Sequence, residues 1–148
     1  MKIAAITALI RPRQWVKNIF IFAPPFFSPS LANDTATENV TLIFIAFCLT
    51  ASGVYCFNDF WDREADKHHP KKKERPVAAG LISPSVALGL YFCLSASGLA
   101  LAFAITQAGW TLLAYFILTS SYTLLLKSIA IVDVLTIALG FVLRVHAG

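Results

Sequence analysis

Long runs of apolar residues dominate the chain and are interrupted by one strongly polar stretch, residues 58–80. Five of the apolar runs approach or exceed the roughly 20 helical residues needed to cross about 30 Å of membrane hydrocarbon. None of the five shows the strict apolar and polar alternation of a barrel strand, so each predicts a helix. The predicted spans are residues 15–31, 40–57, 81–105, 107–126 and 128–147.

Two segments near the N-terminus modify this pattern. Pro24 and Pro25 should kink or break the first span, because proline removes a backbone donor and clashes with the preceding turn. The opening residues 2–10 are followed at once by Arg11 and Arg13, without the small-residue cleavage site of a secretory signal. We expect this short segment to lie with its apolar face on the membrane surface.

Composition supports a membrane protein. Hydrophobic residues make up 57% of the 148 positions and the mean hydropathy is +0.70, whereas soluble domains hold roughly 45–50% apolar residues. The predicted fold is therefore all-α, a polytopic transmembrane helical bundle forming one domain over residues 1–148. Small residues of the third span would let helices approach closely; they are Gly89, Ser95, Ser97, Gly98 and Ala100. Cys48, Cys56 and Cys93 lack disulfide or metal spacing and are interpreted as buried small hydrophobes.

The distribution of lysine and arginine predicts the orientation. These residues precede the first span, fill the polar stretch between the second and third, and recur between the fourth and fifth. The opposite loops, residues 32–39 and 106–110, contain neither. Because positive charge favours the cytosolic side, we expect a multi-pass protein of the plasma (inner) membrane with a cytosolic N-terminus and a cytosolic 58–80 loop. Five spans then place the C-terminus on the other side.

The polar stretch begins with an acidic motif, NDFWDREAD. Asn58, Asp62 and Asp66 are spaced i, i+4 and i+8, and Asp59 is three and seven residues from the two later aspartates, so a helix would carry all four on one face. Clustered carboxylates ask for a cation, and Mg²⁺ takes one or two hard oxygen ligands together with water and substrate phosphate. A solvated acidic helix end is the alternative. The position of the acidic motif beside an apolar span favours a functional site over this alternative.

A basic cluster, KHHPKKKER, follows directly over residues 67–75. Orientation and attraction to anionic lipid would explain it in general terms. The more specific hypothesis is that Lys72 and Arg75 bind substrate phosphate, since arginine suits bidentate contact and lysine acts as a point charge. The adjacent His68 and His69 lack the spacing of zinc ligands. The whole stretch is therefore interpreted as a Mg²⁺-diphosphate site on the cytosolic face.

The motif at residues 58–66 resembles the first signature, NDxxDxxxD, of the UbiA-type intramembrane prenyltransferase superfamily. Three further stretches resemble its decaprenyl-phosphate phosphoribosyltransferase branch. They are RPRQWVKN at 11–18, HPKKKERPVAAG at 69–80 and YTLLLKSIAIVDVLTIALGFVLR at 122–144.

The resemblance implies a Mg²⁺-dependent transferase in which diphosphate is the leaving group. The donor would be phosphoribosyl pyrophosphate and the acceptor a polyprenyl phosphate in the bilayer, for cell-envelope synthesis, with no nucleic acid involved. It implies metal binding by Asn58, Asp62 and Asp66 with Asp59 in support, and catalytic roles for Asp62 and Asp66. The positions implied to grip phosphate are Lys17, Lys72, Arg75, Tyr122 and Lys127.

The chain also departs from this family. Its members have about nine spans and a second carboxylate motif, so five spans correspond to half of a nine-helix fold. Three explanations compete: a fragment of a longer protein, a truncated and inactive product, or a partner chain that supplies the other half. Asp133 and Arg144 lie eleven residues apart on one face of the last span, about 16 Å along it, and no role is assigned to them.

Two other functions remain open. The first is a prenyltransferase that moves an isoprenoid chain from its diphosphate to an aromatic acceptor, which would use the same metal-diphosphate site. The second is a non-catalytic membrane protein that binds anionic lipid through its basic loop.

Overall fold

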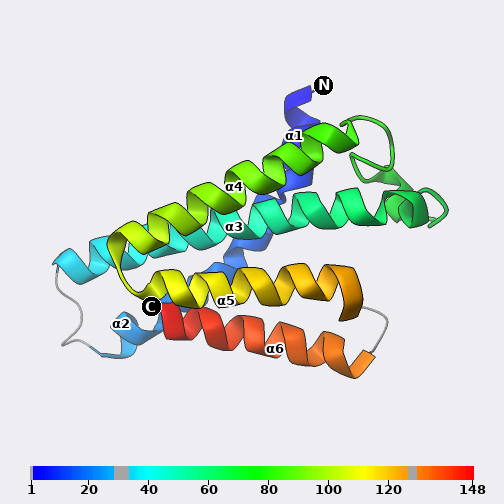
Figure 1. The fold of residues 1–148 in the computed structure, drawn as a ribbon. Coiled ribbons are helices and arrows are strands. Elements are labelled where there is room, and N and C mark those ends of the chain that lie inside the picture. Colours follow the sequence, from blue (N-terminus) through cyan, green and yellow to red (C-terminus); the bar gives the residue numbers. More distant parts are fainter. Residues whose placement is uncertain (1, 29–33, 127–129) are drawn as a thin grey trace.

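The computed structural model describes residues 2–28, 34–126 and 130–148, and these parts of the chain form helices and turns without a strand. Four helices run alternately up and down beside one another, and the N-terminal segments cross behind them (Figure 1). The four are α3 (Asp34–Lys67), α4 (Pro84–Ile105), α5 (Ala108–Ser121) and α6 (Ala130–Ala147). The N-terminal elements are α1 (Lys2–Ile10), the 3₁₀ helix η1 (Pro12–Phe22) and α2 (Ala23–Phe27). The predicted all-α bundle is confirmed.

Helix α3 is the longest element and carries both the second predicted span and the acidic motif. Its 34 residues extend about 50 Å, more than the roughly 30 Å of hydrocarbon in a membrane. The acidic motif is therefore helical, as predicted, and continues the span without a break. Among the described residues, α3 and α4 are long and apolar enough to cross a membrane by themselves. Helix α5 is shorter and continues into a π-helical segment, η4 (Tyr122–Leu126).

The first predicted span differs from the structure. Residues 12–22 form a 3₁₀ helix, and the helix type changes at Ala23, immediately before the two prolines. A 3₁₀ helix has three residues per turn, so Trp15, Asn18 and Ile21 line up on one side of it. Asn18 and Ile21 are buried and Trp15 contacts α3. Docking of this three-residue row against the bundle explains why the segment is not a plain α-helix.

Small residues bring α3 and α4 into close contact. A side-chain Cβ at Gly53 would collide with Ser95 Oγ, and one at Gly98 would collide with Thr50 Oγ1. The predicted role of small residues in close helix packing is confirmed for Ser95 and Gly98. It was wrong for Gly89, which has open space around it, and for the exposed Ser97 and Ala100, because run composition does not show which side of α4 meets α3. Van der Waals packing of this kind replaces the hydrophobic driving force, which is weak between helices in lipid.

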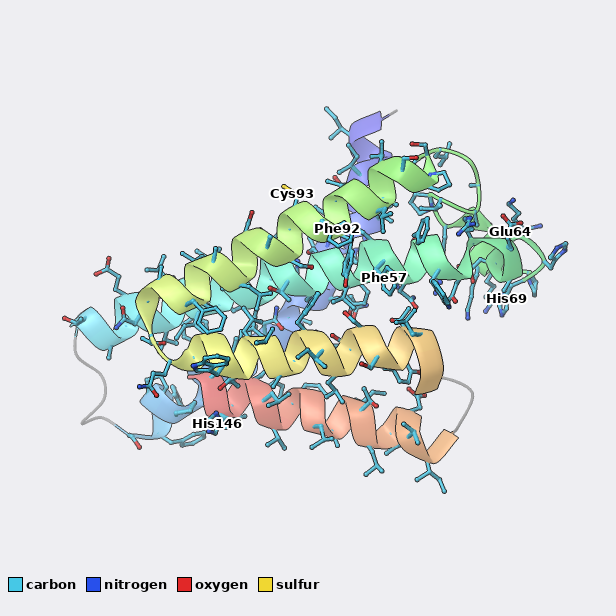
Figure 2. All side chains as sticks on the ribbon, viewed as in Figure 1. Phe57, Glu64, His69, Phe92, Cys93 and His146 are labelled. Atoms are coloured by element: carbon cyan, nitrogen blue, oxygen red, sulfur yellow. The ribbon has the colours of Figure 1, made fainter. Side chains whose placement is uncertain are left out.

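The cysteines only partly follow the prediction. Cys48 and Cys56 are buried, but Cys93 is exposed on the side of α4 that faces away from α3 (Figure 2). Helix α4 is apolar on every side because one side faces its neighbours and the others face lipid, so composition does not reveal which side is inward. The expectation that Cys93 is buried was wrong for this reason.

Helix α1 packs on the bundle through one face. Ala5 and Leu9 join a buried cluster with Cys56 and Phe57 of α3, whereas Ile3 is exposed. The C-terminal end of α3, the end of α5 and the start of α6 lie at the same end of the bundle, as the predicted alternation of spans requires (Figure 1).

Candidate functional site: a polar pocket beside the acidic motif

The acidic motif on α3 turns toward two different surroundings. Successive residues of an α-helix are rotated by about 100°, so Asn58 and Asp62 lie within about 40° of each other. Asp59 and Asp66 lie about 80–100° round from Asn58 and within about 20° of each other. Asn58 lines an internal pocket, whereas Asp59 and Asp66 pair with arginines. All four residues thus lie within about 100° of one another on one face, as predicted, and their contacts divide this face into two neighbouring half-faces. Asp62 lies about 40° from both Asn58 and Asp66 and is grouped with Asn58 because its charge acts on Tyr122 of the pocket.

Asp59 and Asp66 belong to a buried network of two carboxylates and two arginines. Arg11 Nη2 lies 2.6 Å from Asp59 Oδ1, and Arg75 Nη1 lies 2.7 Å from Asp66 Oδ2 and 3.6 Å from Asp59 Oδ1. The two carboxylate side chains are only 0% and 3% exposed. Two positive and two negative charges balance here, which lowers the cost of burying each one. Among the described residues, Asp59 Oδ2 has no hydrogen-bond partner.

Arg11 also marks the junction between α1 and η1. Its backbone is left-handed, with φ 51° and ψ 61°, a conformation that costs a non-glycine residue roughly 1–2 kcal/mol. Its guanidinium carbon lies 5.1 Å from the ring centroid of Tyr55, a cation–π contact. The contacts with Asp59 and Tyr55 offset the backbone cost and fix the direction in which η1 leaves α1.

Polar side chains join η1 to α3 along its length. Beyond Arg11, Trp15 Nε1 donates to Ser52 Oγ at 2.9 Å, and Asn18 Nδ2 donates to Cys48 Sγ at 3.2 Å. The partners Asp59, Ser52 and Cys48 follow one another down α3, so the two segments run antiparallel. This docking explains the polar residues of the RPRQWVKN stretch and places Lys17 on the wall of the pocket.

The pocket has a volume of about 280 Å³ and is enclosed by η1, α3, α5, η4 and α6. Its polar lining includes Lys17, Asn58, Tyr122, Asp133 and Arg144. Aromatic side chains from α3, α5 and α6 also line the wall. A concave site of this size with a few converging polar groups is the usual form of a small-molecule site.

The end of the pocket nearest the polar loop holds Asn58, Tyr122 and Asp133, and we call it the mouth. The Tyr122 hydroxyl donates to Asp133 Oδ1 at 2.7 Å, which joins the π-helical segment to the start of α6. Asp62 is half-buried one helical turn beyond Asn58, and its charge acts on the Tyr122 hydroxyl. π-helical segments occur often at functional sites.

Arg144 lies at the opposite, deep end of the pocket and is 6% exposed. Its Nε donates to Asn18 Oδ1 at 2.8 Å, its Nη1 to the Gly140 carbonyl oxygen at 2.6 Å, and its Nη2 to the Tyr115 hydroxyl at 3.0 Å. The guanidinium also lies over the Tyr115 ring, 4.7 Å from its centroid. All these partners are neutral.

The residues predicted for the site fall into separate groups. Lys17, Asn58 and Tyr122 come together at the pocket, whereas Arg75 joins Asp59 and Asp66 outside its lining. Lys72 is exposed in the short helix η3 (Lys72–Glu74), at the end of the bundle where Figure 2 labels Glu64 and His69. Lys127 lies outside the described residues.

The structure adds three residues to the site for which the sequence predicted no role: Arg11, Asn18 and Arg144. Arg11 and Asn18 stand at the two ends of RPRQWVKN, but nothing in that pattern names their partners. Arg144 shares a helix face with Asp133, which was the one available signal. Its contact with Asn18 joins residues 126 positions apart, so no local pattern could reveal it.

The donor atoms at the mouth suit a magnesium ion that is completed by substrate. Among the described residues, no three Asp, Glu, His or Cys side chains lie close enough to hold a metal ion alone. Mg²⁺ does not need such a cage, because it binds through one or two carboxylates, water and substrate phosphates. The Asn58 amide oxygen and the Asp62 carboxylate offer two hard ligands on one half-face.

Several known proteins are similar to this chain in sequence. The chain is 34% identical over 144 residues to the decaprenyl-phosphate phosphoribosyltransferase of Corynebacterium glutamicum, which covers 94% of this chain and 43% of that protein. It is 33% identical over 151 residues to the protein of the same name from Mycolicibacterium smegmatis, covering 99% and 48%. A protoheme IX farnesyltransferase of Pyrobaculum arsenaticum is 31% identical over 123 residues, covering 80% and 43%.

The chain thus spans about half the length of the curated relatives it matches. A sequence model described as the UbiA prenyltransferase family matches residues 19–148, which include α3, α4, α5 and α6 with the acidic motif and the pocket. Members of this family are integral membrane proteins, in agreement with the apolar bundle. The chain belongs to the UbiA prenyltransferase family.

Proposed function

We propose that the chain takes part in a Mg²⁺-dependent transfer of the 5-phosphoribosyl group from phosphoribosyl pyrophosphate to a polyprenyl phosphate. The observation that carries this proposal is the polar pocket, which has Asn58 and Lys17 in its lining and lies one helical turn from Asp62. The names of two relatives that are similar over nearly the whole chain support the phosphoribosyl donor.

Asn58 and Asp62 would hold the magnesium ion at the mouth of the pocket. The bound ion would stabilise the negative charge that develops on the departing diphosphate. Lys17 would neutralise phosphate charge from the pocket wall, while the Tyr122 hydroxyl, held by Asp133, is a further polar group at the mouth. The C1–O bond of the ribose breaks with its electron pair going to the diphosphate, and a phosphate oxygen of the acceptor bonds to C1.

Asp66 and Arg75 would change partners when substrate binds. Each is now occupied by the other, at 2.7 Å. If Asp66 becomes a metal ligand, Arg75 is released and can pair with a phosphate oxygen, so the number of charge pairs is conserved. Lys72 is exposed and precedes Arg75 by three residues. It would reach the same phosphates from the solvent side. Asp59 stays with Arg11 and supports the motif.

The membrane orientation belongs to the same proposal. The mouth of the pocket and the 58–80 loop would face the cytosol. The water-soluble donor, phosphoribosyl pyrophosphate, would reach the pocket from that side, and the acceptor would enter from the bilayer. Because the chain spans about half the length of its relatives, a second polypeptide segment would complete the enclosure of both substrates.

Transfer of labelled phosphoribosyl pyrophosphate to polyprenyl phosphate in membranes that contain this chain tests the proposal. We expect Mg²⁺-dependent product with the unchanged chain and none with Asp62→Asn. The matched control is Glu64→Gln, an exposed carboxylate two residues away that pairs with Lys67 on the surface. Loss of transfer in both variants, or donor binding that does not depend on Mg²⁺, would contradict the assignment.

A prenyltransferase reaction is the second candidate, favoured by the similarity to a protoheme IX farnesyltransferase. The same membranes incubated with labelled prenyl diphosphate and an aromatic acceptor distinguish the two. Product in this assay alone would select the prenyl donor.

A further inference from the structure

Arg144 is a buried cation that the proposed metal site does not use. The part of the chain that the structure describes gives it no carboxylate partner, and its three hydrogen bonds go to an amide, a carbonyl and a hydroxyl oxygen. A buried charge without a counter-ion is costly, and charged groups inside membrane bundles usually serve function. A guanidinium has five N–H groups, so two remain for a ligand at the pocket.

We infer that Lys17 and Arg144, which we call the deep cations, bind a phosphomonoester group. In the donor this group would be the phosphate on C5 of the ribose, so the inference rests on the proposed function and adds a second phosphate site to it.

The two cations belong to one assembly. Asn18 accepts from Arg144 Nε through its side-chain oxygen, and its neighbour Lys17 lines the same pocket. Asn18 is itself held on α3 through Cys48, so η1 cannot move away without breaking both bonds. A planar guanidinium and an ammonium that line one pocket are suitable groups for binding phosphate oxygens.

The charge along the pocket is uneven. Among the described residues that line the pocket, Asp133 is the one with a carboxylate, and the Tyr122 hydroxyl holds it at the mouth. Eleven residues, or about 16 Å along α6, separate Asp133 from Arg144. The deep end therefore keeps its positive charge, while the mouth offers oxygen ligands for a metal ion.

This arrangement discriminates between donors. A sugar with diphosphate on one carbon and a phosphate on another is anionic at both ends and matches this arrangement. A prenyl diphosphate would instead place hydrocarbon against the deep cations and remove them from water without a counter-charge. The deep cations should thus select the phosphoribosyl donor.

Binding to the purified full chain in nanodiscs tests the inference with three probes: ribose 5-phosphate, inorganic diphosphate with Mg²⁺, and farnesyl phosphate. We expect Lys17→Gln and Arg144→Gln each to weaken ribose 5-phosphate binding about tenfold or more, the effect of one lost charged hydrogen bond. Binding of Mg²⁺-diphosphate should change less. The matched control is Arg13→Gln, an exposed cation of η1 outside the pocket lining, which should leave all three unchanged.

Two comparisons keep the inference separate from folding and from the metal site. Lys17 is exposed, so Lys17→Gln should fold normally even if Arg144→Gln does not. Asp62→Asn should abolish Mg²⁺-diphosphate binding and spare ribose 5-phosphate, the reverse of the deep-cation variants. If Mg²⁺-diphosphate fails to bind to the unchanged chain while ribose 5-phosphate binds through the deep cations, the proposed function fails and the phosphomonoester site stands.

Other outcomes would overturn the inference. It fails if ribose 5-phosphate does not bind the unchanged chain, or binds it as tightly after Lys17→Gln as before. An effect of the deep-cation variants on farnesyl phosphate alone would assign the site to the lipid acceptor and refute the donor assignment.

Discussion

The ion pair between Arg11 and Asp59 should hold η1 against α3. Replacing Arg11 by glutamine removes the cation 2.6 Å from a carboxylate that is 0% exposed. Breaking one partner of a buried pair costs about 3–5 kcal/mol because the other charge stays buried. Arg75 remains 3.6 Å from the same oxygen and compensates in part, so we expect a loss near the lower end, about 3 kcal/mol.

The free energy of unfolding in detergent micelles, followed by helical circular dichroism during a denaturant titration, measures this loss. Arg13→Gln is the control, because this exposed arginine lies two residues away and surface substitutions usually change stability by about 0.5 kcal/mol or less. A double-mutant cycle with Asp59→Asn should give a coupling energy of about 1–3 kcal/mol. Equal stability of the Arg11 and Arg13 variants, or additive effects in the cycle, would refute the reasoning.

Three further predictions concern packing and exposure. Gly98→Ala should destabilise the bundle by about 1–3 kcal/mol because its Cβ would overlap α3, whereas Gly89→Ala, with open space around it, should be neutral or slightly stabilising in the same titration. In the folded chain in detergent, a small membrane-permeant maleimide should label Cys93, which faces the detergent, faster than the buried Cys48, as mass spectrometry of the peptides can show; equal rates would contradict the burial. Trp15→Phe should lower stability by about 1 kcal/mol by losing one hydrogen bond, and an unchanged unfolding midpoint would show that this bond contributes nothing.

The helical bundle follows from sequence because long apolar runs have few alternatives in a membrane. The predicted spans agree with α4, with α5 and η4 together, and with α6 to within three residues at each end, and the predicted span 40–57 lies inside the longer α3. The agreement arises because an unpaired backbone in lipid is too costly for irregular structure. The 3₁₀ segment η1 was missed because its apolar residues were judged by run length alone. The three-residue spacing of Trp15, Asn18 and Ile21 could have indicated a 3₁₀ helix, but it does so only if one side of the segment is known to pack against α3.

The sequence predicted several residues of the candidate site but few of the contacts between them. The i, i+4 spacing placed Asn58 and Asp62 side by side, because both lie on one helix and helix geometry alone determines their relative position. Arg11, Asn18 and Arg144 depend on contacts between distant segments, which no periodicity encodes. Lysine and arginine near spans are so often explained by orientation that their individual roles stay hidden until their partners are known.

The two half-faces of the acidic motif give its aspartates different tasks. Asp59 pairs with Arg11, which anchors η1, and through η1 it positions Lys17 at the pocket. Asp62 lies one helical turn from Asn58 at the mouth, and its charge acts on Tyr122. Asp59→Asn should therefore lower the free energy of unfolding while Mg²⁺-diphosphate still binds to the molecules that remain folded. Asp62→Asn should leave stability nearly unchanged and abolish that binding, because its half-buried carboxylate is proposed to face the metal. Calorimetric titration and denaturant unfolding on the same two variants separate these effects. If both variants lose binding and both keep full stability, all four motif residues act as one ligand set, and the division into half-faces has no functional meaning.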